Sequence, residues 1–175
     1  MKNTLFFTNA QKILAFMAIP LKPEYTERDI LSGVKVSRPG VNLGLKELMD
    51  AGLVSRIKKG GTYFYTVEKQ EPVIKQLKTV LTVLMLRNII GKLRRLSEKG
   101  ILFGSASRGE NSVDSDIDLF VVSQNTQAVE KIVNNNKLNI QLIVKTPVRY
   151  AEQEKKEPDF SREVERGIIL WQKTE

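Results

Sequence analysis

The chain has 175 residues, 41% of them hydrophobic, which allows one domain or two small ones. It contains neither cysteine nor histidine, so disulfides, Cys/His zinc sites and histidine-based catalysis are excluded. Residues 1–100 hold 18 Lys and Arg against 8 Asp and Glu, whereas residues 101–175 hold 10 against 12. A basic region of this kind is typical of nucleic-acid binding, and equally of an ordinary lysine-rich surface.

The sequence also carries expectations about its compartment. Its most apolar stretch, residues 80–86, is far too short to cross a bilayer, and no secretory leader is recognisable. The lack of cysteine fits a reducing environment. We therefore expect a cytoplasmic protein with no membrane partner.

Three helices and a hairpin are predicted within residues 1–70. Apolar residues at helical spacing predict a first helix over residues 8–19. Thr26 and Ser37 are suited to cap the second and third helices, and Gly52 is placed to end the third. Gly60 and Gly61, between two β-type runs, predict a tight hairpin.

This order of elements resembles a winged helix-turn-helix. The run from Ser37 to Val54 is similar to the recognition helix of winged transcriptional regulators, including its Ala-Gly-Leu-Val ending before a basic wing. The resemblance implies that the third helix enters the major groove of double-stranded DNA. The residues that would contact DNA are Arg38, Asn42 and Lys46 on the helix and Arg56, Lys58 and Lys59 on the wing. Winged helices also bind proteins, so a partner protein remains the alternative.

Residues 71–99 have helical character almost throughout. Asn88 and Gly91 are predicted to break this helix into two parts. We expect residues 71–86 to form a helical bridge and residues 87–175 to form the second domain. The apolar surface of the helix exceeds what one small domain needs, which suggests a homodimer seam.

The segment over residues 101–122 carries the clearest chemical pattern. It predicts a strand, a turn at Gly104-Ser105 that opens a short helix, a loop, and a strand carrying Asp116 and Asp118. Side chains two apart on a strand share a face, and two such carboxylates repel unless a cation lies between them. An all-oxygen pair suits Mg²⁺ or Mn²⁺. Gly104 permits close backbone approach to a ligand, so the turn could hold a phosphate. Together these features indicate phosphoryl or nucleotidyl transfer.

Over residues 85–172 the sequence resembles the nucleotidyltransferase superfamily of DNA polymerase β, in particular its small stand-alone branch. The matching residues are Gly104-Ser105, Arg108-Gly109-Glu110 and Asp116-Ile117-Asp118. The resemblance implies a small mixed sheet with flanking helices, and hence an α+β protein overall. It implies that a nucleoside triphosphate lies near Gly104, Ser105 and Arg108. It further implies that Asp116 and Asp118 are catalytic and hold Mg²⁺.

One position departs from this family. The family carries a third carboxylate on the strand predicted over residues 138–144, and the matching residue here is Gln141. An amide cannot act as a general base, so we expect any transfer to be slow. Asp159 or Glu165 is the alternative source of an acid. Two short helices and a final strand, with Trp171 in the core, complete the predicted domain.

Three functions are compatible with these patterns. The first is a DNA-binding transcriptional regulator whose C-terminal domain binds a nucleotide and Mg²⁺. The second is an active nucleotidyltransferase that moves a nucleoside monophosphate onto a hydroxyl of a small molecule, a protein or an RNA. The third is an antitoxin of the same class that modifies a partner protein.

Overall fold

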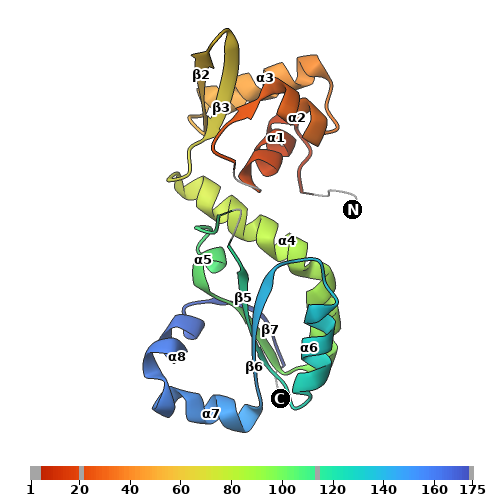
Figure 1. Cartoon of the computed structure of the whole chain (residues 1–175), viewed down its shortest axis with the longest axis vertical. Coiled ribbons are helices and arrows are strands. Elements are labelled where there is room, and N and C mark those ends of the chain that lie inside the picture. The colour runs from red at the N-terminus through yellow and green to blue at the C-terminus, as the bar shows by residue number, and fades with distance from the viewer. Residues whose placement is uncertain (1–4, 20–21, 113–114, 174–175) are drawn as a thin grey trace. The chain divides into compact units, whose positions relative to one another are not determined.

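The computed structural model describes residues 5–19, 22–112 and 115–173, except the side chain at position 154. The chain divides into two compact units, Met1–Leu81 and Thr82–Glu175, drawn in red to yellow-green and in green to blue in Figure 1. The division falls inside the longest helix. Within the described residues, no helix is long and apolar enough to span a membrane.

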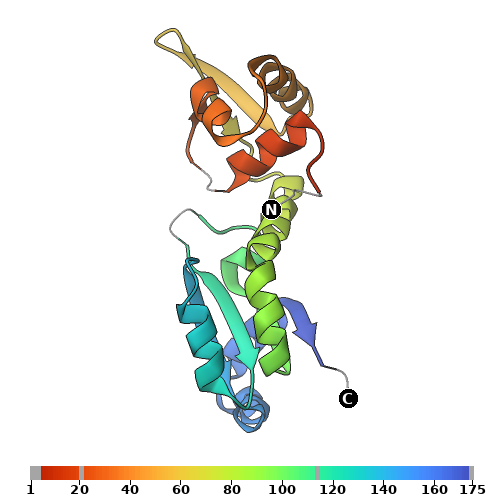
Figure 2. The same cartoon turned by 90° about the vertical axis from the view of Figure 1, so that its right-hand side faces the viewer.

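Among its described residues, the first unit contains three complete helices, the first turns of the longest helix and a three-stranded antiparallel sheet in the order β1-β3-β2 (Figure 2). Its elements are α1 (Asn9–Ala18), β1 (Tyr25–Thr26), α2 (Glu27–Gly33), α3 (Arg38–Asp50), β2 (Val54–Lys59) and β3 (Thr62–Val67). The predicted caps are confirmed, because the Thr26 hydroxyl accepts from the backbone N–H of Asp29 and the Ser37 hydroxyl from that of Gly40. Gly60 and Gly61 both have positive φ and form the predicted hairpin turn.

Two glycines allow α1 to approach α3 closely. A Cβ on Gly44 would lie 2.7 Å from Ile13 Cδ1 and 3.0 Å from the backbone nitrogen of Ala10. A Cβ on Gly40 would lie 2.7 Å from Asn9 Nδ2. The glycines thus fix one side of α3 against α1 and leave its opposite side to solvent.

The second unit is built on a mixed four-stranded sheet in the order β6-β5-β4-β7 (Figure 1). The strands are β4 (Lys99–Leu102), β5 (Ile117–Val122), β6 (Ile140–Lys145) and β7 (Ile168–Gln172). β5 and β6 run parallel, while β4 is antiparallel to both of its neighbours. This agrees with the mixed sheet and flanking helices expected from the sequence.

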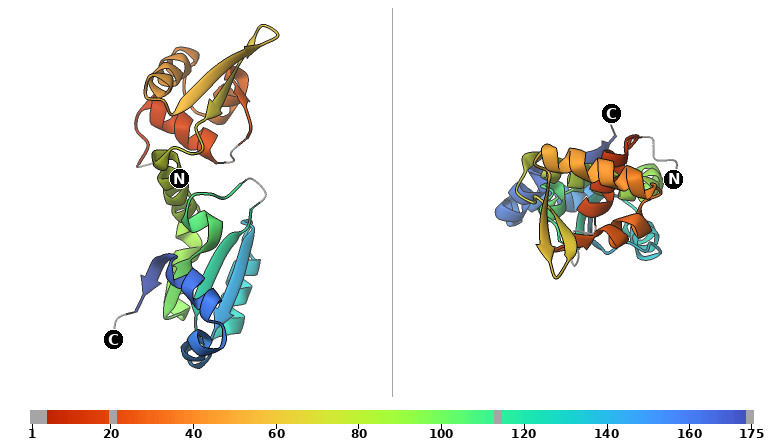
Figure 3. Two further views of the ribbon diagram at one scale, coloured as in Figure 1. Left: turned by 90° about the vertical axis from the view of Figure 1, so that its left-hand side faces the viewer. Right: turned by 90° about the horizontal axis from the view of Figure 1, so that it is seen from above.

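Helices cover both faces of this sheet. Residues 82–96 of α4 (Pro72–Leu96) and α6 (Thr126–Asn134) pack on one face, over a core that includes Leu119 and Val121. α7 (Pro147–Lys156) and α8 (Pro158–Glu165) lie on the other face, over Phe120 and Val122. Figure 1 shows α7 and α8 to the left of the strands and α6 with this part of α4 to the right, and the left view of Figure 3 looks onto the α7–α8 side. The one-turn helix α5 (Gly104–Ser107) follows β4 directly.

The predicted break near Asn88 and Gly91 is wrong, since α4 runs unbroken from Pro72 to Leu96. One glycine in a helix costs only about 1 kcal/mol. Leu86, Ile89 and Leu93, at helical spacing on either side of Gly91, are buried against the sheet and hold the helix together. Packing therefore overrides the local signal.

Trp171 lies in the core, as predicted from the sequence, with only 4% of its surface exposed. Its indole Nε1–H donates to the Ser97 hydroxyl at 3.1 Å. The ring lies over Gly100, where a Cβ would meet it at 2.2 Å. This contact packs β7 against β4, and β7 forms one edge of the sheet.

Candidate functional site

The site is organised around the contact between Gly104 and Asp118. Gly104 has a φ of +65°, and a Cβ there would lie 2.1 Å from Asp118 Oδ2. The backbone N–H of Phe103 donates to the Asp118 carbonyl at 3.1 Å, which fixes the turn beside β5. A glycine is required both by the backbone conformation and by the approaching carboxylate.

The two carboxylates expected on one strand are placed slightly differently. Asp118 lies in β5, whereas Asp116 directly precedes the strand, which begins at Ile117. Backbone pairing nevertheless reaches back to this point, because the Ile117 N–H donates to the Asn139 carbonyl at 2.9 Å. The Asn139 side chain donates to Asp116 Oδ1 and holds that carboxylate next to β6.

A third acid, Glu163, acts electrostatically on Asp118 of the carboxylate pair. Burial raises the pKa of the Asp118 carboxyl, and the negative charges of Asp116 and Glu163 raise it further, while Arg108 acts in the opposite direction. Glu163 lies on α8, the helix that also carries Asp159 and Glu165, and it is the acid of this helix that the sequence did not suggest. Two further negative charges near the half-buried Asp118 carboxylate favour a bound cation.

Gln141 stands at the position where the resemblance to the polymerase β superfamily predicts a third acid. It pairs with Asp118 in the parallel β5–β6 ladder, so both side chains leave the sheet on the same face. Its amide is exposed. The neighbour of Asp118 on β6 is therefore a neutral group.

A cavity of about 450 Å³ adjoins α5 and is lined by six polar residues. These are Ser107, Arg108, Asp159, Arg162, Glu163 and Arg166. Of the two acids that the sequence suggested as substitutes for the missing carboxylate, Asp159 lines this cavity, while Glu165 lines a different one beside Gln153 and Ser161. Residues 159, 162, 163 and 166 are polar and follow one another at helical intervals. This pattern is the sequence signal that could have revealed the cavity.

The residues expected at the phosphates are only partly engaged within the protein. Arg108 forms an ion pair with Glu110, with 2.9 Å between Nε and Oε2. Ser105 is half-buried, and its carbonyl accepts from the Glu110 N–H at 2.9 Å. The Ser107 hydroxyl donates to the Gly104 carbonyl at 2.8 Å, which tightens the turn.

Comparison with known families decides the identity of this unit. Residues 85–170 match the family model of the nucleotidyltransferase domain, in agreement with the expected range. The second unit carries a nucleotidyltransferase domain. No curated protein matches the chain at a significant level.

Two solved structures show limited likeness to the chain. A presumed nucleotidyltransferase from Sulfolobus solfataricus is 19% identical, with a TM-score of 0.41, and the likeness covers 61% of this chain and 92% of that one. TrmBL2, an archaeal chromatin protein described with a novel mode of DNA binding, is 12% identical, with a TM-score of 0.31, covering 89% of this chain and 72% of that one. Both TM-scores are low, so the assignment rests on the family match.

The donor set of the nucleotidyltransferase domain fits a hard divalent cation. Among the described residues, no three Asp, Glu, His or Cys side chains form a ready-made metal site. Mg²⁺ commonly takes only one or two protein carboxylates and completes its shell with water and substrate phosphates. Asp116 and Asp118 meet that requirement, and the mutual repulsion of their charges is what a cation would relieve.

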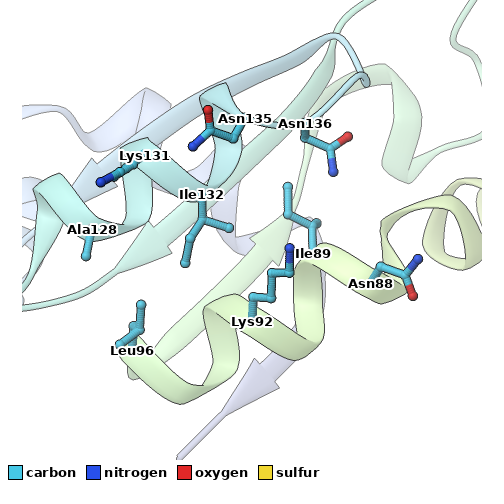
Figure 4. A pocket seen from close by; sticks show the side chains of 9 residues that line it. All are labelled: Asn88, Ile89, Lys92, Leu96, Ala128, Lys131, Ile132, Asn135 and Asn136. Atoms are coloured by element: carbon cyan, nitrogen blue, oxygen red, sulfur yellow. The ribbon is translucent and has the colours of Figure 1, made fainter.

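A second cavity, of about 350 Å³, lies on the opposite face of the sheet, between α4 and α6 (Figure 4). Ile89 and Ile132 line it together with Lys92 and Lys131. Asp118 points to the α7–α8 face because Leu119, its neighbour along β5, belongs to the core under α4 and α6. This cavity is therefore separated from the carboxylates by the sheet.

The first unit presents the other predicted surface. Arg38, Asn42 and Lys46 are exposed on α3 at intervals of four residues, which places them on one side of the helix. Arg38 forms an ion pair with Glu27, with 3.0 Å between Nε and Oε1.

Lys58 and Lys59 lie next to the hairpin turn, and Arg56 lies further back on β2. Arg56 stacks over the Tyr63 ring, 4.4 Å from its centroid, and Lys58 approaches the same ring at 5.8 Å. Lys59 pairs with Glu24, which leaves less of its charge available to a partner.

Proposed function

We propose that the nucleotidyltransferase domain binds a nucleoside triphosphate together with Mg²⁺ or Mn²⁺. Asp116 and Asp118 would hold the cation, and Gly104, Ser105 and Arg108 would lie at the phosphates. The observation that carries this proposal is the close approach of Gly104 to the Asp118 carboxylate, which puts the Gly104-Ser105 turn directly beside that carboxylate. The bound cation would neutralise charge on the phosphates.

In the reaction of such a site, an acceptor hydroxyl oxygen bonds to the α-phosphorus and the bond to the bridging β-oxygen breaks, so that pyrophosphate leaves. The acceptor hydroxyl must give up its proton as this happens. Gln141 cannot receive that proton, and loss of a positioned base typically costs roughly 10²–10⁴ in rate. We infer that the natural protein binds nucleotide and transfers it slowly. The charge of Glu163 near Asp118 favours the alternative of an active transferase.

For the first unit we propose a winged helix-turn-helix that binds double-stranded DNA. Three features support this: the order of three helices and a hairpin, the exposed face of α3, and the basic tip of the hairpin. α3 would lie in the major groove and the hairpin along the phosphates. The whole chain would then be a cytoplasmic transcriptional regulator with a nucleotide-binding domain. Homodimerisation through α4 stays a prediction.

Titration of the purified protein with each triphosphate tests the first proposal. We expect binding that is at least about ten-fold tighter with Mg²⁺ than without it, because the phosphates would be ligands in the coordination shell of the cation. Calorimetry measures the affinity, and analysis of the products detects pyrophosphate and any modified acceptor. Absence of heat for all four triphosphates, with both Mg²⁺ and Mn²⁺, would refute the proposal.

DNA binding should depend steeply on salt, since neutralised phosphates release counterions. Replacing Lys58 and Lys59 with Ala should weaken binding to all DNA sequences alike. It should also lower the slope of log affinity against log salt concentration by about one to two. Asn42→Ala should instead alter the preference between sequences, at about 1–3 kcal/mol for a base contact.

Fluorescence anisotropy over a salt series measures both effects. The control is the double variant Lys137→Ala/Lys155→Ala, which removes two exposed lysines from the nucleotidyltransferase domain. If the protein shows no shift at low salt on a broad set of duplexes, including its own promoter, the DNA proposal is wrong.

A further inference from the structure

We propose that one face of α8 forms a phosphate-binding subsite of the nucleotidyltransferase domain, with Arg162 and Arg166 as its donors beside Arg108. The inference deepens the proposed nucleotide binding and rests on it. The phosphate would belong either to the tail of the nucleoside triphosphate or to an anionic acceptor.

The packing of α8 fixes which face it presents. Phe160 contacts the rings of Phe103 and Phe120 at centroid distances of 5.9 and 6.2 Å, and Val164 is fully buried. Just after the helix, a Cβ on Gly167 would lie 2.5 Å from the Leu102 carbonyl oxygen, so the chain passes directly against β4. The helix is thus held at both ends and cannot turn its polar face away.

The opposite face carries charged residues at positions 159, 162 and 163, and Arg166, the C-cap residue directly after α8, continues this face. Their spacing of three and four residues aligns them in one row, and all four line the cavity of about 450 Å³ beside α5. Ser107 and Arg108, from the α5 turn, line the same cavity. Glu163 and Arg108 both act on the Asp118 carboxyl, so the row lies close to the proposed cation site.

The charged side chains that line the cavity are positive on balance, which favours binding of an anion. Three guanidinium groups line it against two carboxylates. Arg162 pairs with Asp159 at 2.6 Å, and Arg108 pairs with Glu110 outside the cavity lining. Arg166 has no ion-pair partner within the part of the chain that the structure describes. A guanidinium fork binds two oxygens of one phosphate, a geometry that a lysine cannot provide.

Calorimetry with tripolyphosphate on the nucleotide-free protein, and with inorganic phosphate on the ATP-saturated protein, tests the subsite and its source. Arg162→Ala and Arg166→Ala should each weaken binding of the responding probe by about ten-fold or more, the size expected for a charge-assisted contact. Arg166→Lys should recover only part of the loss, because the charge returns without the fork. Arg95→Ala, an exposed arginine of α4 on the other face of the sheet, is the matched control. Thermal unfolding of each variant verifies its fold.

The two sources give different results. If the subsite holds the nucleotide tail, tripolyphosphate competes with ATP and the arginine variants weaken it. If the subsite serves an acceptor, inorganic phosphate binds while ATP is bound, and the variants weaken that binding instead. The inference is overturned if neither probe binds, or if both bind the arginine variants as well as the wild type. Mg²⁺-dependent ATP binding, measured in parallel, shows whether the proposed function survives that result.

Discussion

Replacing Asp116 with Asn should abolish the Mg²⁺ dependence of triphosphate binding while leaving the fold intact. An amide is a poor ligand for Mg²⁺, and the site would then offer a single carboxylate. The oxygen of the introduced amide could still accept the hydrogen bond that Asn139 donates, so the local structure has no reason to change. Calorimetric titration of ATP with and without Mg²⁺ measures the effect. Glu130→Gln, an exposed acid of α6 on the other face of the sheet, is the control.

The same variant should stabilise the cation-free protein. The pKa of Asp118 is raised by burial, then by Asp116 and by Glu163, so ionising this carboxyl costs free energy in the folded state. That cost is fully present above the folded pKa and disappears as the pH falls below the value of about 3.9 that is usual for Asp. We expect Asp116→Asn to gain about 1 kcal/mol or less near pH 7, because an exposed charge is screened, and nothing at about pH 3.

Thermal unfolding of the cation-free protein at the two pH values measures this gain. A variant that keeps the Mg²⁺ dependence of the wild type would show that Asp116 is not a ligand. A loss of stability near pH 7 would show that the Asn139 contact outweighs the repulsion.

Gln141→Asp should raise nucleotidyl transfer by roughly 10²–10⁴, the usual contribution of a positioned general base. The structure gives this substitution a geometric basis, since Gln141 pairs with Asp118 in register on the neighbouring parallel strand. Adjacent strands lie about 4.8 Å apart, within which two carboxylates can share one cation. Gln141→Glu is tested alongside, because its side chain keeps the length of glutamine.

Pyrophosphate release from each triphosphate, with analysis of the nucleotide products, measures the gain. Gln141→Asn shortens the side chain as Asp does but adds no charge, so it separates the effect of the base from that of size. Rapid turnover by the wild type would mean that another acid completes the site, and Glu163→Gln would then identify it by loss of rate. Equal, vanishing rates in all forms, with ATP still bound, would indicate a nucleotide sensor.

Local signals in the sequence were enough to predict most of the elements. Thr26 and Ser37 form hydrogen bonds within a few residues, and the Gly60-Gly61 turn needs only its own backbone freedom, so these predictions hold without tertiary context. The resemblance to the nucleotidyltransferase family was enough to expect Gln141 at the position of the third acid. Alternation fixes which side chains of one strand share a face, but only the parallel pairing of β5 with β6 sets Gln141 opposite Asp118.

Other features depend on contacts between residues far apart in the chain. α4 continues through Gly91 because burial of its neighbours against the sheet outweighs the cost of one glycine. The link between Asn139 and Asp116 requires β6 to lie beside β5.

The third acid near Asp118 and the charged residues of α8 show most clearly what the sequence alone does not predict. The sequence suggested Asp159 or Glu165, but Glu163 is the acid of α8 whose charge acts on Asp118. Helical spacing alone shows that residues 159, 162, 163 and 166 share a face. Only the burial of Phe160 and Val164 against the sheet decides that this face lines the cavity beside α5. The sequence by itself determines which residues stand together on an element, whereas the packing of the core determines what that element faces.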